Sequence, residues 1–334
     1  MEQKMEQKME QKREFDYSIA LVRIVSCIMI FLCHYVQILG NPIIAQTAQF
    51  FNVGVFVFFM ISGYLLGQKQ INKGELASWY KKRMTRIFVP LYIVMIVVFV
   101  ALYFEGVQVS PKIYIMYALN LQAFGVSISG AGQLWFLTVI MICYLITPLL
   151  QKTKDWNRRI KGVVTIIFIL IQLVAGLIGI RFIALYVFYV GTYALGYYIL
   201  PNIIRNINRK STLRWSVAML IAVGIRLVSK VVIGYSYIYD YIIVLYTQVV
   251  LGIWIIIAIK YVYQMFKEYL NYRLIKTMDG YTMEVYMVHV MFMQPPFYMF
   301  GKVNLVIDSC MIVICTILAA VILKKLEKIV NMAD

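Results

Sequence analysis

The sequence predicts an all-α integral membrane protein with about ten transmembrane helices. Hydrophobic residues make up 62% of the 334-residue chain and charged residues only 14%, whereas soluble domains are about half apolar and about a quarter charged. Apolar runs long enough to cross a bilayer recur along the whole chain, and the basic residues gather in every second connection between them. Membrane orientation therefore accounts for the net charge of +17, and we expect no nucleic-acid partner.

A polar tail precedes the apolar part of the chain. The tetrapeptide Met-Glu-Gln-Lys stands three times within the first 12 residues and has no apolar face to bury. We therefore predict a solvated tail over residues 1–14 and a single transmembrane domain over residues 15–329. The ten predicted spans cover about residues 18–39, 50–68, 87–104, 133–150, 162–180, 182–200, 213–233, 241–259, 281–299 and 303–323.

The distribution of Lys and Arg predicts the orientation of these spans. With a cytoplasmic N-terminus, 26 of the 32 Lys and Arg residues fall in cytoplasmic segments. Five fall outside, and Arg23 lies within the first span. This bias predicts that the N- and C-termini are both cytoplasmic. The first apolar run has an acidic flank and no small-residue cleavage site, so we expect no cleavable signal peptide.

Residues 105–132 form the main irregular segment of the predicted fold. Its apolar part, 113–124, is about 12 residues long and too short to span a bilayer. Two interpretations stay open: a segment that re-enters the protein and caps an outer cavity, or an ordinary outer loop. Non-helical backbone at membrane depth is tolerated only against protein or water.

The cysteines and histidines do not predict a metal site. All five cysteines fall in apolar segments without metal-type spacing, which is typical of buried thiols. The two histidines, His34 and His289, are too few for a structural zinc site. We expect no metal.

Two ionisable residues, whose burial in a bilayer costs free energy, interrupt the first span. Arg23 and His34 are 11 positions apart, which is within about 20° of three full helical turns, so both lie on one face about 16 Å apart. An ionisable residue at membrane depth normally faces the protein interior and has a function. The alternatives are an Arg23 that snorkels to the headgroups and a His34 that only packs.

Other motifs lie at the ends of the predicted spans. Arg83 and Arg86 are three positions apart before the third span and share a face if helical, which suits phosphate recognition or anionic lipid. Ser62 with Gly63 permits close approach of another helix or a ligand in the second span. Trp135 begins the fourth span, where interfacial tryptophan is common.

The ninth predicted span holds the second histidine. Both histidines of the chain lie within spans, which favours a functional role for His289. Tyr286 lies about one turn before it and is placed to orient the ring. Glu284 is five positions away, about 140° around a helix, so we do not expect it to contact His289.

Together, these motifs resemble the acyltransferase-3 family of bacterial integral membrane proteins. The resemblance rests on motifs that occur in family order over most of the chain: Arg23 with His34, Phe58-Phe-Met-Ile-Ser-Gly-Tyr64, Tyr80-Lys-Lys-Arg-Met-Thr-Arg-Ile-Phe-Val-Pro90, Leu134-Trp-Phe-Leu137, and Val285-Tyr-Met-Val-His289. Some members carry Arg-x-Arg in the third motif, whereas this chain has Arg83-x-x-Arg86.

The resemblance implies a multi-pass O-acetyltransferase of the bacterial cytoplasmic membrane. Such enzymes move an acetyl or other short acyl group from acetyl-CoA, or a similar acyl-CoA, to a hydroxyl of a cell-envelope polysaccharide or its lipid-linked precursor. It implies His34 and Arg23 as catalytic residues, and Arg83 and Arg86 as the site for the coenzyme A phosphates. The remaining motif residues would contact the substrate or support the site: Ser62, Trp135, Tyr286 and His289. For His289 three roles stay open: a second base, a hydrogen-bond prop for His34, or packing.

Two other functions fit the same polar residues. Arg and His inside a membrane also suit a transporter or exporter of an envelope sugar or small solute. A scaffold in polysaccharide synthesis machinery would need neither the arginine nor the histidine for its function. Binding and cleavage of acyl-CoA separates the enzyme from both.

Overall fold

The computed structural model describes residues 15–332, and this part of the chain is helical with no strand. The predicted tail, 1–14, lies outside the described residues. The longer helices are α2 (Tyr17–Ile38), α3 (Pro42–Phe51), α4 (Val53–Gly67), α5 (Leu76–Phe104), α7 (Trp135–Lys152), α8 (Arg158–Leu177), α9 (Arg181–Tyr198), α11 (Arg209–Ile233), α12 (Val244–Phe266) and α15 (Leu305–Met332).

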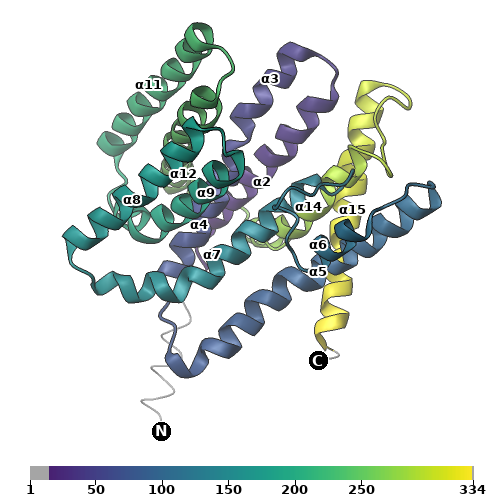
Figure 1. The fold of residues 1–334 in the computed structure, drawn as a ribbon, viewed down its shortest axis with the longest axis horizontal. Helices are drawn as coiled ribbons and strands as arrows, with labels where there is room; N and C mark the ends of the chain where they lie inside the picture. Colours follow the sequence, from purple (N-terminus) through teal and green to yellow (C-terminus); the bar gives the residue numbers. More distant parts are fainter. Residues whose placement is uncertain (1–14, 333–334) are drawn as a thin grey trace.

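Shorter helical elements connect the long ones. They are η1 (Lys73–Glu75), α6 (Pro111–Ala118), η2 (Gly132–Leu134), η3 (Thr153–Asp155), α10 (Leu200–Arg205), the π-helix η4 (Tyr239–Ile243), η5 (Lys267–Tyr269), α13 (Tyr272–Asp279), α14 (Thr282–Val288) and η6 (His289–Phe292). In Figure 1, α8, α9, α11 and α12 form one side of the bundle, α5, α14 and α15 the other, and α2, α4 and α7 lie between them.

Within residues 15–332, seven helical segments are long and apolar enough to cross a membrane, judged by length and composition: Tyr17–Ile38, Pro42–Gly67, Leu76–Phe104, Gly132–Asp155, Arg209–Ile233, Tyr239–Tyr269 and Leu305–Asn331. Each coincides with one of the ten predicted spans. Helices α8 and α9 occupy predicted spans five and six, and the apolar part of α8, Gly162–Leu177, is shorter than the seven. The all-α membrane fold is therefore supported, and the count of about ten stays a prediction.

The ninth predicted span is not one continuous helix. Helix α14 ends at Val288, the 3₁₀ helix η6 continues only to Phe292, and irregular backbone follows up to α15. This irregular segment contains Pro295 and Pro296. Proline has no backbone N–H and its ring clashes with the preceding turn, so a helix cannot continue through the pair.

Two predicted spans begin earlier than the apolar pattern indicates. The second begins at Pro42, because the Asn41 side chain accepts hydrogen bonds from the N–H groups of Ile43 and Ile44 and caps α3. Proline at the first helical position needs no N–H donor. The third begins at Leu76, so Arg83 and Arg86 lie within α5.

Contacts between helix ends define the two ends of the bundle. At one end, Lys260 near the end of α12 hydrogen-bonds Ser18 at the start of α2, and Lys324 in α15 donates to the Gly280 carbonyl after α13, at 2.7 Å. At the other end, Tyr35 in α2 hydrogen-bonds Ser309 in α15. The start of α2 and the last turns of α15 thus share one end, as an even number of crossings requires.

The irregular segment between α5 and α7 is folded into the protein. Asn120 and Gln122 are buried, and their side-chain amides donate to the carbonyl oxygens of Leu137 and Leu134 at 3.1 and 2.8 Å. The N–H of Gly130 donates to the Gln294 side chain at 3.2 Å. Of the two sequence-based interpretations, these contacts favour the packed segment over an ordinary loop.

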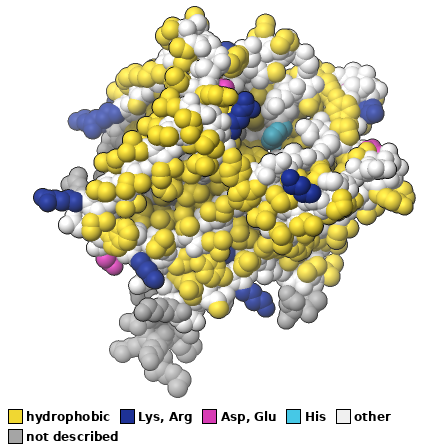
Figure 2. Space-filling view, viewed as in Figure 1, with side chains coloured by type: hydrophobic (Ala, Val, Ile, Leu, Met, Phe, Trp, Pro, Cys, Tyr) yellow, Lys and Arg dark blue, Asp and Glu magenta, His cyan; other side chains and the backbone are white. Residues whose placement is uncertain are grey.

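The outside of the bundle is largely apolar. Hydrophobic side chains cover most of the face drawn in Figure 2. Helix α11 is the clearest case, with exposed residues such as Leu220, Val231 and Val232. A large exposed apolar surface marks contact with lipid or another apolar partner.

Candidate functional site

Helix α2 carries the two polar residues that the sequence analysis singled out. Its first turn is capped by the Asp16 carboxylate, which accepts from the N–H of Ile19 at 3.1 Å. The helix then continues unbroken to Ile38, so Arg23 and His34 share one face. Both face the segment 279–289, which runs alongside α2 in the same direction.

Three contacts along this seam show the parallel alignment. Arg23 forms an ion pair with Asp279. One turn further on, the Cys27 thiol contacts the Thr282 carbonyl oxygen at 3.4 Å. The rings of His34 and His289 then lie with their centroids 5.1 Å apart.

The Arg23–Asp279 ion pair lies at the Tyr17 end of this seam. The Arg23 side chain is 26% exposed and that of Asp279 only 6%. Burial raises the pKa of the Asp279 carboxyl above its ordinary value, and the positive charge of Arg23 opposes that rise. Arg23 Nε and Asp279 Oδ1 are buried and have no hydrogen-bond partner in the described part of the chain.

The histidine pair lies further along α2. His289 is buried, and its Nδ1 is 2.8 Å from the backbone carbonyl oxygen of Tyr286. A carbonyl only accepts, so Nδ1 carries the proton and Nε2 presents a lone pair. Among the described residues Nε2 has no partner. One histidine side chain is visible in a depression on the face in Figure 2.

Tyr286 orients His289 through its backbone. The helical spacing predicts that the Tyr286 side chain, one turn earlier, orients the ring. Instead the phenol donates to the Gln133 carbonyl, while the Gln133 side chain donates to the Met287 carbonyl at 2.8 Å. Gln133 and Tyr286 thus fasten α14 to the start of α7.

A second ion pair fixes α14 to α15. Lys324 Nζ lies 2.5 Å from Glu284 Oε1, and the Glu284 side chain is 4% exposed. As the helical spacing predicts, Glu284 points away from His289. Sequence reasoning did not identify Asp279 or Lys324 as partners, although an ionisable residue in an apolar run signals that an opposite charge lies nearby.

Helix α5 brings the two predicted phosphate-binding arginines near this seam. The half-buried Arg83 guanidinium lies 5.7 Å from the Trp79 ring centroid and 5.8 Å from that of Tyr144. Arg86 is exposed and interacts electrostatically with Asp279. Tyr144 also interacts electrostatically with Arg86 and Arg23, so the three arginines lie in the same region of the bundle.

Ser62 and Trp135 take structural positions in the described part of the chain. Ser62 is half-buried in α4 beside Gly63, where α4 meets α9 closely. Trp135 packs against Tyr186 and Tyr189, with ring centroids 5.9 and 5.1 Å apart. No contact found in residues 15–332 joins either side chain to the histidine pair.

Potential metal ligands do not cluster in this site. Residues 15–332 contain no group of three or more His, Cys, Asp or Glu side chains placed to hold a metal ion. Of the five cysteines predicted to be buried thiols, Cys27, Cys33 and Cys143 are buried, whereas Cys310 is exposed and Cys315 is half-buried in α15.

Comparison with known proteins identifies the family. Nodulation protein 10 of Rhizobium leguminosarum bv. viciae is 29% identical to this chain over 31% of the chain and 35% of that protein, so the likeness spans about a third of the relative's length. No solved structure matches the chain significantly. The acyltransferase-3 family model, described as an acyltransferase domain, matches residues 16–324, nearly the whole chain. The chain therefore belongs to this acyltransferase family.

Proposed function

We propose that the protein is a membrane O-acyltransferase that transfers an acetyl or other short acyl group from acyl-CoA to a hydroxyl of a cell-envelope polysaccharide or its lipid-linked precursor. The site would lie in the bacterial cytoplasmic membrane. One observation carries the proposal: in a chain of an acyltransferase family, His34 faces a second histidine, and Arg23 lies on the same helix face.

His34 acts as the general base in this proposal. The Tyr286 carbonyl holds His289 with its Nε2 lone pair free. The two rings are not hydrogen-bonded in the described structure; in the proposed reaction the His34 N–H turns to donate to that lone pair, which leaves the other His34 nitrogen to take the proton of the acceptor hydroxyl. His289 is thus a positioning residue.

The transfer then follows from ordinary acyl chemistry. The acceptor oxygen attacks the thioester carbonyl, forms the new C–O bond and places negative charge on the carbonyl oxygen. Collapse of this intermediate breaks the C–S bond. The leaving thiolate receives the proton from His34, so protons balance over the cycle. Arg23 lies on the same helix face but about 16 Å from His34, too far to contact the oxyanion, so its positive charge is placed to guide the acyl arm of the donor toward His34.

The donor would enter from the end of the bundle that holds Arg23. Coenzyme A carries phosphates, and guanidinium groups bind phosphate in a bidentate manner. Arg83 and Arg86 suit this role because neither forms an ion pair with a described carboxylate, and Arg83 Nε lacks a partner among them.

The first test measures the O-acyl content of envelope glycans by mass spectrometry. A strain that lacks the gene is complemented with the native chain, with His34→Ala, or with Gln37→Ala at equal membrane levels. Gln37 is an exposed residue about one turn beyond His34 on α2 and serves as the matched control. We expect the native chain and Gln37→Ala to restore an acyl mass that His34→Ala does not restore.

A second measurement separates the enzyme from a transporter or scaffold. Purified protein in liposomes is given acetyl-CoA together with envelope glycan as the acceptor, and release of free coenzyme A is followed. Release by the native chain and not by His34→Ala supports acyl transfer. Unchanged glycan acylation in every strain, together with no thioester cleavage, would refute the proposal.

A further inference from the structure

A pocket and a groove lie end to end along the contact of α11 with η4 and α12. The Arg226 pocket has a volume of about 190 Å³ and is lined by Ile43, Gln46, Thr47, Gln49, Phe50, Arg226, Leu227, Lys230 and Tyr239. The apolar groove has a volume of about 450 Å³ and is lined by Ala218, Ile221, Ala222, Ile225, Ile242, Ile243, Tyr246, Thr247 and Val250.

Arg226 is buried without a carboxylate partner. The residue is 1% exposed, and its Nη2 donates to the Gln49 side-chain oxygen at 3.1 Å. Tyr239 also hydrogen-bonds the guanidinium, whose carbon lies 4.4 Å from the Phe50 ring centroid. Nη1 has no partner in the described structure. Burial of a charge costs free energy unless an opposite charge pairs with it. We therefore expect the Arg226 guanidinium to bind an anion.

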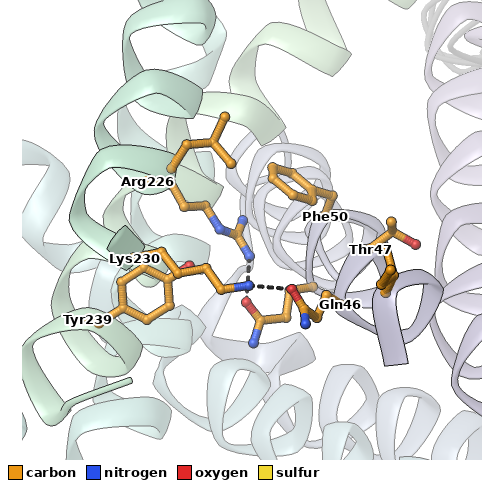
Figure 3. Close-up of a pocket in the computed structure, with 9 residues that line it drawn as sticks. Gln46, Thr47, Phe50, Arg226, Lys230 and Tyr239 are labelled. Carbon is orange, nitrogen blue, oxygen red and sulfur yellow. Dashed lines mark hydrogen bonds between the residues drawn. The ribbon is translucent and has the colours of Figure 1, made fainter. Parts of the chain in front are cut away.

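A second cation lines the same pocket. Lys230 is one turn after Arg226 on α11, and its Nζ donates to the Gln46 side-chain oxygen at 2.6 Å. Figure 3 shows both basic side chains reaching from α11 toward the glutamines of α3. None of the nine lining residues is acidic. Asp240, which follows Tyr239, interacts electrostatically with Arg181 instead. The two positive charges therefore repel each other unless an anion lies between them.

The groove continues the pocket toward the middle of the bundle. Ile225 precedes Arg226 on α11, and Ile242 follows Tyr239 within the same π-helix η4. Seven of the nine groove residues are aliphatic, and the hydroxyls of the other two are already engaged: Tyr246 donates to the Gln172 side chain at 3.2 Å and Thr247 to the Ile243 carbonyl at 2.7 Å. The groove thus offers an apolar surface to a ligand, while the pocket offers positive charge.

We propose that the Arg226 pocket and the apolar groove together bind a membrane lipid with a phosphate headgroup. The phosphate lies between Arg226 and Lys230, and a hydrocarbon chain lies in the groove. Guanidinium and ammonium groups are the usual protein partners of phosphate. Because the Lys and Arg distribution predicts this end of α11 to be outer, the lipid belongs to the outer leaflet. The proposal does not depend on acyl transfer.

The test uses three probes that separate headgroup from chain. Purified full-length protein in detergent is incubated with dioleoyl phosphatidic acid, with dioleoylglycerol, which has the same chains without phosphate, or with inorganic phosphate. Native mass spectrometry measures the bound fraction. We expect phosphatidic acid to bind at least about tenfold more tightly than either other probe, because only it fills both sites.

Substitutions locate the binding on the protein. Arg226→Gln and Lys230→Gln are each expected to weaken phosphatidic acid binding roughly tenfold, the loss of one charge-assisted contact. Lys302→Gln removes an exposed positive charge predicted on the same side and should change nothing. Lys230 is only half-buried, so its variant tests the site even if Arg226→Gln does not fold.

Three results would overturn the proposal. Equal binding of phosphatidic acid and dioleoylglycerol removes the role of the phosphate. Full competition by inorganic phosphate at equal concentration removes the role of the groove. Undiminished binding in Lys230→Gln places the lipid elsewhere, whatever the result for Lys302→Gln.

Discussion

At the scale of single residues, the site depends on how opposite charges balance the charges of a few buried ionisable groups. Arg23 is paired with Asp279, and the next segment places Glu284 against Lys324. Both carboxylates are almost fully buried, so each ion pair holds together the two helical segments that carry its partners. Removing one partner of such a pair leaves an uncompensated charge, which costs more than the pair itself contributes.

Asp279 is therefore expected to hold Arg23 in a working position. Asp279→Asn should lower acyl transfer by roughly tenfold to a hundredfold, because the released guanidinium no longer has one orientation. The expected loss of stability is about 1–3 kcal/mol, since a hydrogen bond to a charged group is removed. Glycan acylation and thermal unfolding in detergent measure the two effects.

The control for this substitution is Asp155→Asn, which changes an exposed carboxylate in η3. It should leave both quantities unchanged. Native acylation by Asp279→Asn would show that Arg23 acts without its ion pair.

At the scale of secondary-structure elements, the close contact of α4 with α9 shapes the centre of the bundle. A Cβ added at Gly63 would lie 2.0 Å from the Tyr193 carbonyl oxygen, and one at Gly196 would lie 2.0 Å from that of Met60. The two glycines thus let the backbones touch in a reciprocal way. A small side chain at Ser62, next to Gly63, fits this close helix contact as well as it fits a bound ligand.

Gly196→Ala is expected to force α4 and α9 apart. Overpacking of this kind costs about 1–3 kcal/mol, and the obstacle here is rigid backbone. The melting temperature in detergent should fall. Gly191→Ala is the matched control on α9, because its Cβ would meet only the Phe168 ring at 3.7 Å. Equal melting temperatures for the two variants would contradict the close contact.

At the scale of the whole molecule, the open question is how many helices cross the bilayer. In the described part of the chain seven segments qualify by length and composition, and α8 and α9 decide whether the predicted pattern holds between α7 and α11. If both cross, the turn at Arg181 lies on the outer side. If neither crosses, that turn stays on the cytoplasmic side.

We expect Arg181→Cys to be labelled from outside intact cells by a membrane-impermeant maleimide. The background chain carries Cys310→Ser, because Cys310 is the exposed native thiol among the described residues. Lys112→Cys is the predicted outer control and Lys210→Cys the predicted inner one. Labelling of Arg181→Cys only after the cells are opened would show that α8 and α9 do not both cross.

Local patterns in the sequence determined most of the secondary structure. Hydropathy and helical spacing depend on neighbouring residues, so they predicted the helices, the shared face of Arg23 and His34, and the helical pair Arg83 and Arg86. The same reasoning missed the break after Phe292, because an apolar count treats Pro295 and Pro296 as ordinary span residues. It also placed the start of the second and third spans too late, where caps and polar first turns extend each helix.

The sequence alone therefore determined an all-α membrane protein with ionisable residues inside its first helix. Only the tertiary structure decided what those residues meet. Asp279 lies 256 positions from Arg23, and Arg226 lies 177 positions from Gln49. Pairing over such distances is set by how the helices pack, since a charge in an apolar run shows that it needs compensation and does not show which residue supplies it.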